Sequence, residues 1–103
     1  MQSVDVNELE NFKGKDMGHS DWMQIDQNRI NQFADATSDH QWIHINEEKA
    51  KAELPTKSTI AHGFLSLSLS VPLSAKIWTI TGAKMIINYG LNKVRFINMV
   101  PVN

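Results

Sequence analysis

The sequence predicts a small domain of the α+β class, and three observations support this prediction. Ile30, Phe33 and Ala34 have the i, i+3, i+4 spacing that is typical of one face of a helix. The segments 84–89 and 93–97 are rich in β-branched and aromatic residues, which favour strands. The length of 103 residues allows one domain, which we expect to span residues 1–103.

Composition and charge exclude several classes of protein. The chain has no cysteine, which excludes a disulfide framework, a thiolate nucleophile and a Cys-ligated zinc site. A net charge of −1 argues against binding nucleic acid by bulk electrostatics, and 42% apolar residues are too many for a disordered chain. The N-terminus lacks the features of a secretory signal, and serines, Pro72 and Lys76 interrupt the apolar stretch 60–80. We expect a cytoplasmic protein with neither a membrane nor a nucleic acid as partner.

In the first third of the chain, the sequence predicts a short N-terminal turn or helix, a short strand and then a longer helix. Residues 1–16 are polar and predict a short turn or helix, and residues 18–25 predict a short strand. Asp26 is a good N-cap, so the helix that buries the Ile30 face begins after it and runs to about Ala36.

The middle of the chain predicts a loop and a second helix. Residues 37–42 are polar and have no period, which predicts a loop. Asn46 is the next N-cap candidate, and acidic residues follow it in the first turn, where the helix dipole favours them. This helix spans residues 47–53, and Pro55 ends it.

The C-terminal half contains one ambiguous segment. Residues 65–71 alternate strictly between apolar residues and serine, and pattern alone favours a strand. Leu65, Leu69 and Leu73 also have the i, i+4 spacing of a helix. The strands at 84–89 and 93–97 form either a hairpin or one strand with a bulge at Gly90.

Residues 39–44 contain the first group that can carry chemistry. Asp39 can orient an imidazole of this loop, and such a pair can hold a water molecule and take its proton. The alternative is structural: the aspartate caps a turn and the histidine fills space at its rim. A metal site is a further alternative, since His40 and His44 are four residues apart and zinc would then need Asp39 or His62 as a third ligand.

Two further groups are candidates for binding. A helix that begins near Gly63 would offer free backbone N–H groups to a substrate oxygen; alternatively, the glycine serves packing and His62 is a hydrogen-bonded core residue. Lys93 and Arg95 would share one face of a strand, where they could hold phosphate groups or simply be solvated. Trp42 is either a lid or a core anchor.

Taken together, these motifs resemble a known family. Residues 33–50 resemble the hydratase-2 motif of the MaoC-like dehydratases, a family that includes the (R)-specific enoyl-CoA hydratases. Residues 59–65 resemble the start of that family's central helix, and residues 87–96 resemble a strand pair of its NodN-like branch. The resemblance covers residues 17–102. Two positions depart from the common motif: Ser38 stands where glycine is usual, and Gln41-Trp42 replaces Asn-Pro.

The resemblance implies a hot-dog fold, in which an antiparallel sheet wraps a long central helix, and a homodimer. It implies that residues 61–78 form a helix, kinked or otherwise adjusted near Pro72, in place of the strand at 65–71. Residues 100–103 resemble the point at which the family enters its third strand. We therefore expect an incomplete hot-dog domain, truncated after the second or third strand. At Ser38 the chain must either avoid a positive φ or bear some strain.

The resemblance also implies a reaction. Asp39 and His44 match the family's catalytic pair, which activates water for addition to a trans-2-enoyl-CoA, giving an (R)-3-hydroxyacyl-CoA. Gly63 matches the glycine whose N–H binds the thioester oxygen. The acyl-CoA is a substrate, and neither a metal nor another cofactor is required. The residues expected to bind substrate are Ser38, Trp42, His62, Lys93 and Arg95. A non-catalytic acyl-CoA-binding or interaction module is the alternative function.

Overall fold

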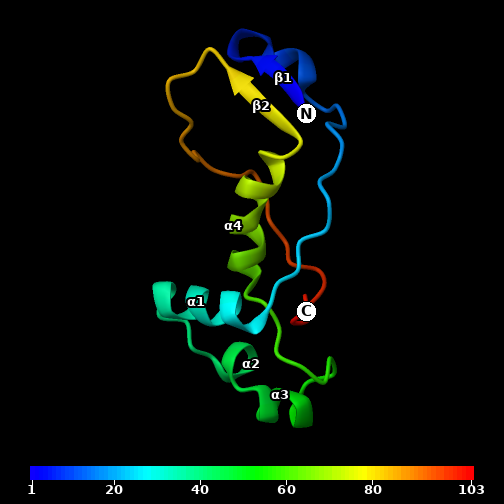
Figure 1. Cartoon of the computed structure of the whole chain (residues 1–103), viewed down its shortest axis with the longest axis vertical. Helices are drawn as coiled ribbons and strands as arrows, with labels where there is room; N and C mark the ends of the chain where they lie inside the picture. The colour runs from blue at the N-terminus through cyan, green and yellow to red at the C-terminus, as the bar shows by residue number, and fades with distance from the viewer. The chain divides into compact units, whose positions relative to one another are not determined.

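The computed structural model describes all 103 residues and combines helices with a small sheet, which confirms the α+β class (Figure 1). The elements, in chain order, are β1 (Gln2–Asp5), the 3₁₀ helix η1 (Val6–Phe12), α1 (Gln27–Thr37), α2 (Trp42–Ile45), α3 (Glu47–Glu53), α4 (Gly63–Ser74) and β2 (Trp78–Thr81). The chain divides into two compact units. Unit 1 comprises residues 1–21 and 69–94, and unit 2 comprises residues 22–68 and 95–103.

Unit 1 is built on a pair of parallel strands. β1 and β2 pair from Gln2 opposite Trp78 to Asp5 opposite Thr81, and Val4 is buried. The polar residues 1–16 predicted a turn or helix and no strand, so β1 was not expected, whereas the helical turn η1 agrees with that prediction. The strand expected at 18–25 is absent, because this segment has no neighbouring strand to receive its backbone hydrogen bonds.

The helix α1 of unit 2 confirms the pattern read from the sequence. A carboxylate oxygen of Asp26 accepts a hydrogen bond from the N–H of Arg29 at 2.8 Å, as an N-cap does. Ile30 and Ala34 are buried on the predicted face. The helix ends with Ser38 in the left-handed region, at φ 60°.

The short helices α2 and α3 follow in the same unit. The structure extends helical geometry into Trp42–Ile45, where the sequence analysis expected a loop up to Trp42. α3 matches the prediction: Asn46 caps it by accepting from the N–H of Lys49 at 3.0 Å, and it ends at Glu53. Pro55 follows two residues later.

The ambiguous segment is helical, as the resemblance implied and the alternation did not. α4 begins at Gly63 and ends at Ser74, so it is shorter than the expected range 61–78, and it contains Pro72 near its end. Leu65 and Leu69 are buried one helical turn apart, so the i, i+4 spacing outweighs the alternation with serine. No helix of the structure combines the length and the apolar character needed to cross a membrane.

The strands expected at 84–89 and 93–97 are absent. Both segments are exposed and have no regular secondary structure. β-propensity produces a strand only where a neighbour satisfies the backbone groups, and no other segment pairs with either one. The sheet that does form is parallel, whereas the resemblance implies an antiparallel one.

The C-terminal residues of unit 2 lie beside the segment that leads into α4. Ile60 and Pro101 form an isolated antiparallel bridge, and the N–H of Ala61 donates to the carbonyl of Val100 at 2.8 Å. The N–H of Val102 donates to the carbonyl of Thr59 at 3.0 Å. This pairing fixes the backbone of residues 59–61, from which the candidate site is built.

Candidate active site

Three residues singled out in the sequence converge in unit 2. One ligand atom from each of Asp39, His44 and His62 lies within 4.8 Å of the other two. His44 is 7% exposed and His62 is 2% exposed, whereas Asp39 is exposed to solvent. The cluster therefore has two buried imidazoles and one accessible carboxylate.

The turn after α1 places Asp39. Ser38 adopts φ 60°, and the N–H groups of Ser38 and Asp39 both donate to the carbonyl of Ala34, at 3.1 Å in the case of Asp39. This is a left-handed helix end, a position that usually carries glycine. Of the two outcomes expected for Ser38, the structure shows the positive φ. The Ser38 side chain is exposed.

Hydrogen bonding fixes the orientation of His44. Its Nδ1 lies 2.7 Å from the carbonyl oxygen of Ile60. A carbonyl only accepts, so Nδ1 carries the hydrogen, and Nε2 of the neutral ring presents its lone pair. The N–H of Ile60 in turn donates to the carbonyl of Ile43 at 3.0 Å, which ties α2 to residues 59–61.

Gln27 supports the same arrangement from α1. Its Nε2 donates to the carbonyl of His44 at 2.7 Å, and its Oε1 accepts from the buried hydroxyl of Thr59. No motif in the sequence marks Gln27 as part of the site. It is the first residue of an amphipathic helix, a position that carries no signal of such a role.

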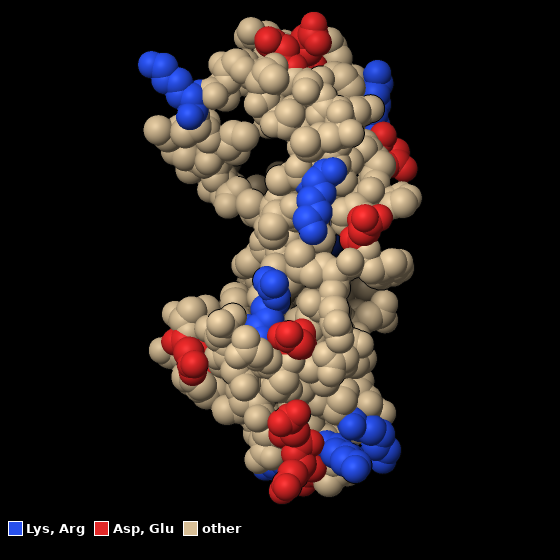
Figure 2. Space-filling model, viewed as in Figure 1, with Lys and Arg blue, Asp and Glu red and all other residues tan.

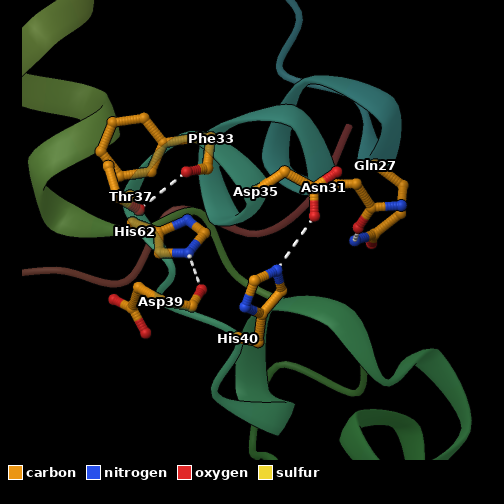
Figure 3. A network of polar contacts seen from close by, with 8 residues as sticks. All are labelled: Gln27, Asn31, Phe33, Asp35, Thr37, Asp39, His40 and His62. Carbon is orange, nitrogen blue, oxygen red and sulfur yellow. Dashed lines mark hydrogen bonds and ion pairs between the residues drawn. The ribbon is translucent and has the colours of Figure 1, made fainter.

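His62 is held in the complementary way. Its Nε2 lies 3.0 Å from the backbone carbonyl oxygen of Asp39, so Nε2 donates and Nδ1 presents a lone pair (Figure 3). The ring stacks on His44 with centroids 3.8 Å apart, and the ring of Phe33 lies 4.9 Å away on α1. Nδ1 is buried and no protein group donates to it.

One ring nitrogen of each histidine and a carboxylate oxygen of Asp39 lie within 4.8 Å of one another. The ring nitrogens that do not donate, Nε2 of His44 and Nδ1 of His62, carry lone pairs. Two acceptors of one water molecule lie about 4.5 Å apart when both hydrogen bonds are about 2.8 Å long. The separations in the cluster therefore suit a bound water molecule.

A metal ion suits the same residues less well. Nitrogen and carboxylate ligands of zinc would be the right chemical types. However, the imidazole planes are inclined by only 22°, so a single ion cannot lie close to both ring planes. His40, a ligand in the alternative weighed from the sequence, lies outside the cluster: its Nε2 is 2.9 Å from the carboxylate of Asp35 (Figure 3).

Gly63 begins α4 with an unused backbone donor. The carbonyl of His62 accepts from the N–H groups of Leu65 and Ser66, at 3.1 and 3.2 Å, whereas the N–H of Gly63 makes no hydrogen bond. Gly63, His44 and Ser66 line one cavity of about 330 Å³. Most of its other walls are apolar: Ile60, Ala61, Phe96, Ile97, Met99 and Val100.

Phe96 and Ser66 were missed as site residues. A Cβ on Gly63 would lie 2.6 Å from the ring of Phe96, which also packs edge-on against Phe64 with centroids 5.7 Å apart. The hydroxyl oxygen of Ser66 is buried without a hydrogen-bond partner. The sequence showed Phe96 only as an apolar position in an expected strand, and Ser66 as one of several similar serines.

The other residues expected to bind substrate do not line this cavity. Trp42 is half-buried, with the ammonium of Lys49 4.6 Å above its ring, so it packs between α2 and α3. Lys93 and Arg95 are exposed, and neither forms an ion pair. Figure 2 shows basic and acidic side chains interspersed on the face drawn, without a large patch of one sign.

Residues 8–103 match the family of the MaoC like domain. The 3-hydroxyacyl-thioester dehydratase Z of Mycobacterium tuberculosis (strain H37Rv) is 52% identical over 97 residues, which cover 94% of this chain and 64% of that protein. Nodulation protein N of Rhizobium meliloti (strain 1021) is 44% identical over 101 residues, covering 97% of this chain and 63% of that protein. The chain thus spans less than two thirds of the length of these relatives.

Proposed function

This chain belongs to the MaoC-like domain family, and we propose that it catalyses the reversible hydration of a trans-2-enoyl-CoA to an (R)-3-hydroxyacyl-CoA. The similarity to a protein named as a 3-hydroxyacyl-thioester dehydratase supports a reaction of this class. We propose a hot-dog fold and a homodimer for the domain on the same ground. The CoA thioester is a substrate, and the reaction uses no further cofactor.

The observation that carries the proposal is that His44 and Gly63 line the same apolar cavity. One supplies a lone pair for a water molecule and the other supplies a free N–H for a thioester oxygen. The apolar walls suit an acyl chain. A hydratase needs these three components around one substrate.

In the proposed reaction, Asp39 and His44 hold and activate a water molecule. As its oxygen bonds to the β-carbon, the electrons of the C=C bond move toward the thioester carbonyl. The catalytic pair takes one hydrogen of the water and delivers it to the α-carbon on the same face. The remaining O–H becomes the 3-hydroxyl group, and dehydration follows the same steps in reverse.

Gly63 would stabilise the charge that develops on the thioester oxygen. Its N–H donates a hydrogen bond that strengthens as the oxygen becomes an enolate, so it lowers the barrier rather than only binding substrate. Loss of one such donor typically lowers the rate by about 10²–10³. The tight contact with Phe96 explains why no side chain is accommodated at this position.

Substrate-binding roles for the remaining residues are also part of the proposal. Lys93 and Arg95 are exposed cations that carry no carboxylate partner, so they are available for the phosphates of CoA. Ser38 and Trp42 flank the segment that carries Asp39. His62 stacks on the ring of His44 and donates to the backbone carbonyl of Asp39, so it would hold the catalytic pair in place beside the substrate.

The proposal is tested by the loss of enoyl-thioester absorbance when the purified chain is added. We expect Asp39→Asn and His44→Ala each to lower the rate by about 10²–10⁴. His40→Ala is the matched control, because His40 is in the same segment but pairs with Asp35 outside the cluster. Full turnover in both cluster variants would refute the assignment.

A non-catalytic acyl-CoA-binding module is the second candidate. The cavity with mostly apolar walls favours it, because such a cavity can bind an acyl group without turnover. Saturable binding of an acyl-CoA without hydration of an enoyl-CoA distinguishes this function from the first.

A further inference from the structure

We propose that Gln27 is a positioning residue for the reaction: through two hydrogen bonds it fixes the orientation and the tautomer of the His44 ring. This inference rests on the proposed hydratase function, in which Asp39 and His44 activate a water molecule. It gives a catalytic consequence to a residue of α1 that does not itself line the substrate cavity.

The side-chain amide of Gln27 uses all of its hydrogen-bonding groups. Its Nε2 donates to the carbonyl of His44 at 2.7 Å and to Oδ1 of Asn31 at 2.9 Å. Its Oε1 accepts from the hydroxyl of Thr59, a residue that is 1% exposed. Exchanging the two ends of the amide would set its oxygen against the His44 carbonyl, so the amide has one defined orientation.

The contacts of Gln27 close a loop of hydrogen bonds around His44. From Gln27 they run through the Thr59 hydroxyl to the adjacent residue Ile60. The carbonyl oxygen of Ile60 lies 2.7 Å from Nδ1 of the His44 ring. The loop returns to Gln27 through the backbone carbonyl of His44. Because the loop is closed, the acceptor of the ring and the backbone that carries the ring keep a fixed relation to each other.

Gln27 also completes the support of the His44 backbone. The peptide group before His44 is held because the carbonyl of Ile43 accepts from the N–H of Ile60 at 3.0 Å. The peptide group after His44 lies at the end of α2, where carbonyls have no partner within the helix. Gln27 supplies the donor to that carbonyl. With both peptide groups fixed, the direction in which the His44 side chain leaves the backbone is fixed too.

This support matters for the reaction because only one nitrogen of a neutral imidazole can accept a hydrogen. The bond from Nδ1 of His44 to the Ile60 carbonyl leaves the lone pair on Nε2. The tautomer of a histidine is set by the hydrogen bond that its other nitrogen makes. If the Ile60 carbonyl is displaced, the ring can adopt the tautomer with hydrogen on Nε2, which cannot take a hydrogen from water.

Gln27→Ala tests the proposal through the separation of kcat from KM. We expect the kcat for hydration of crotonyl-CoA to fall about 10–100-fold, as misplacement of a catalytic group does. The KM should stay unchanged, because the cavity walls and the N–H of Gly63 remain. Asn31→Ala is the matched control: it removes the exposed partner of the same amide and should leave kcat unchanged. An unchanged kcat in Gln27→Ala overturns the inference.

A second substitution separates positioning from stability. Adding Thr59→Val to Gln27→Ala removes the hydroxyl that would be left unpaired, so part of the lost stability returns. The kcat should stay low, because neither support of the His44 ring is restored. If kcat recovers together with stability, Gln27 only stabilises the fold and the inference is overturned.

¹⁵N NMR of the imidazoles reads the tautomer without any substrate. In the wild-type chain we expect hydrogen on Nδ1 of His44 and a lone pair on Nε2. In the double variant of Gln27 and Thr59 we expect a mixture of the two tautomers. Hydrogen on Nε2 in the wild type, which can be measured even if the variants do not fold, overturns the inference, as does an unchanged tautomer in the double variant. Absence of turnover by the wild type instead defeats the proposed function, and the NMR result still decides whether Gln27 positions the ring.

Discussion

The imidazole rings of His44 and His62 stack with centroids 3.8 Å apart. Each ring donates one N–H to a backbone carbonyl in the chain segment that carries the other ring. His44 donates to Ile60, two residues before His62, and His62 donates to Asp39, five residues before His44. The two rings therefore connect the turn that carries Asp39 to the segment that leads into α4. The remaining nitrogen of each ring carries a lone pair.

We predict that Ser38→Gly stabilises the chain. Ser38 has φ 60°, a region in which a Cβ introduces strain that glycine does not have. After allowing for the greater entropy of unfolded glycine, the expected gain is about 0.5–1 kcal/mol in the free energy of unfolding. Urea denaturation measures it.

Thr37→Gly is the matched control for Ser38→Gly, because Thr37 is the last residue of α1. Glycine in helical geometry should destabilise the chain by up to about 1 kcal/mol. If both substitutions lower the stability equally, Ser38 is not strained.

Gly63 and Phe96 should be energetically coupled. A Cβ at residue 63 would lie 2.6 Å from the Phe96 ring, so Gly63→Ala forces that ring to move. We expect a loss of about 1–3 kcal/mol in the free energy of unfolding from Gly63→Ala. In the Phe96→Ala background the same change should have little effect.

A double-mutant cycle measures this coupling, with an expected interaction of about 0.5–3 kcal/mol. Additive effects of the two substitutions would mean that the contact does not constrain residue 63. In that case the absence of a Cβ at residue 63 would serve the close approach of substrate to its N–H rather than the packing of Phe96.

Gln27 should stabilise the site through two hydrogen bonds. Gln27→Ala removes the acceptor of the buried Thr59 hydroxyl and the donor to the His44 carbonyl. Leaving these groups unsatisfied should lower the free energy of unfolding by about 1–3 kcal/mol. Thermal and urea denaturation provide the measurement.

Asn31→Ala is the control for Gln27→Ala. Asn31 also accepts from the Gln27 amide, at 2.9 Å, but on an exposed face of α1, so its loss should change stability by less than about 0.5 kcal/mol. Replacing Thr59 by valine in the Gln27→Ala background should recover part of the loss, because no hydroxyl then remains unpaired. Failure of that recovery would contradict this explanation.

Lys93 and Arg95 should affect only substrates that carry phosphates. Alanine at both positions should raise the KM for an enoyl-CoA several-fold, since two exposed cations no longer attract the CoA phosphates. The KM for the matching N-acetylcysteamine thioester, which has no phosphate, should not change. Equal effects on both thioesters would rule out phosphate binding by these residues.

Local signals in the sequence predicted part of this structure. Asp26 and Asn46 are N-caps where the sequence places them, and the buried face of α1 contains Ile30 and Ala34. These features depend on neighbours within one helical turn, so a single sequence contains the information. Asp39, His44 and His62 were all singled out from the sequence, and the structure brings them together.

Features that depend on distant partners could not be predicted in this way. β1 forms because β2 lies beside it, and the sequence of residues 2–5 alone does not predict pairing with a strand that distant in the chain. The segment 84–97 has strand-forming residues but no partner, and it has no regular structure. Gln27 and Phe96 act on residues far away in the chain, so their roles appear only once the chain is folded.

The central claim is that the cluster adds water to an enoyl thioester on one face. The most direct test incubates the purified chain with crotonyl-CoA in D₂O and determines the configuration of the 3-hydroxybutyryl product. We predict the (R)-3-hydroxy product, with one deuterium at the α-carbon on the face that received the hydroxyl, and no product with Asp39→Asn. Formation of the (S) product, or of no hydroxyacyl product by the wild-type chain, would contradict the account.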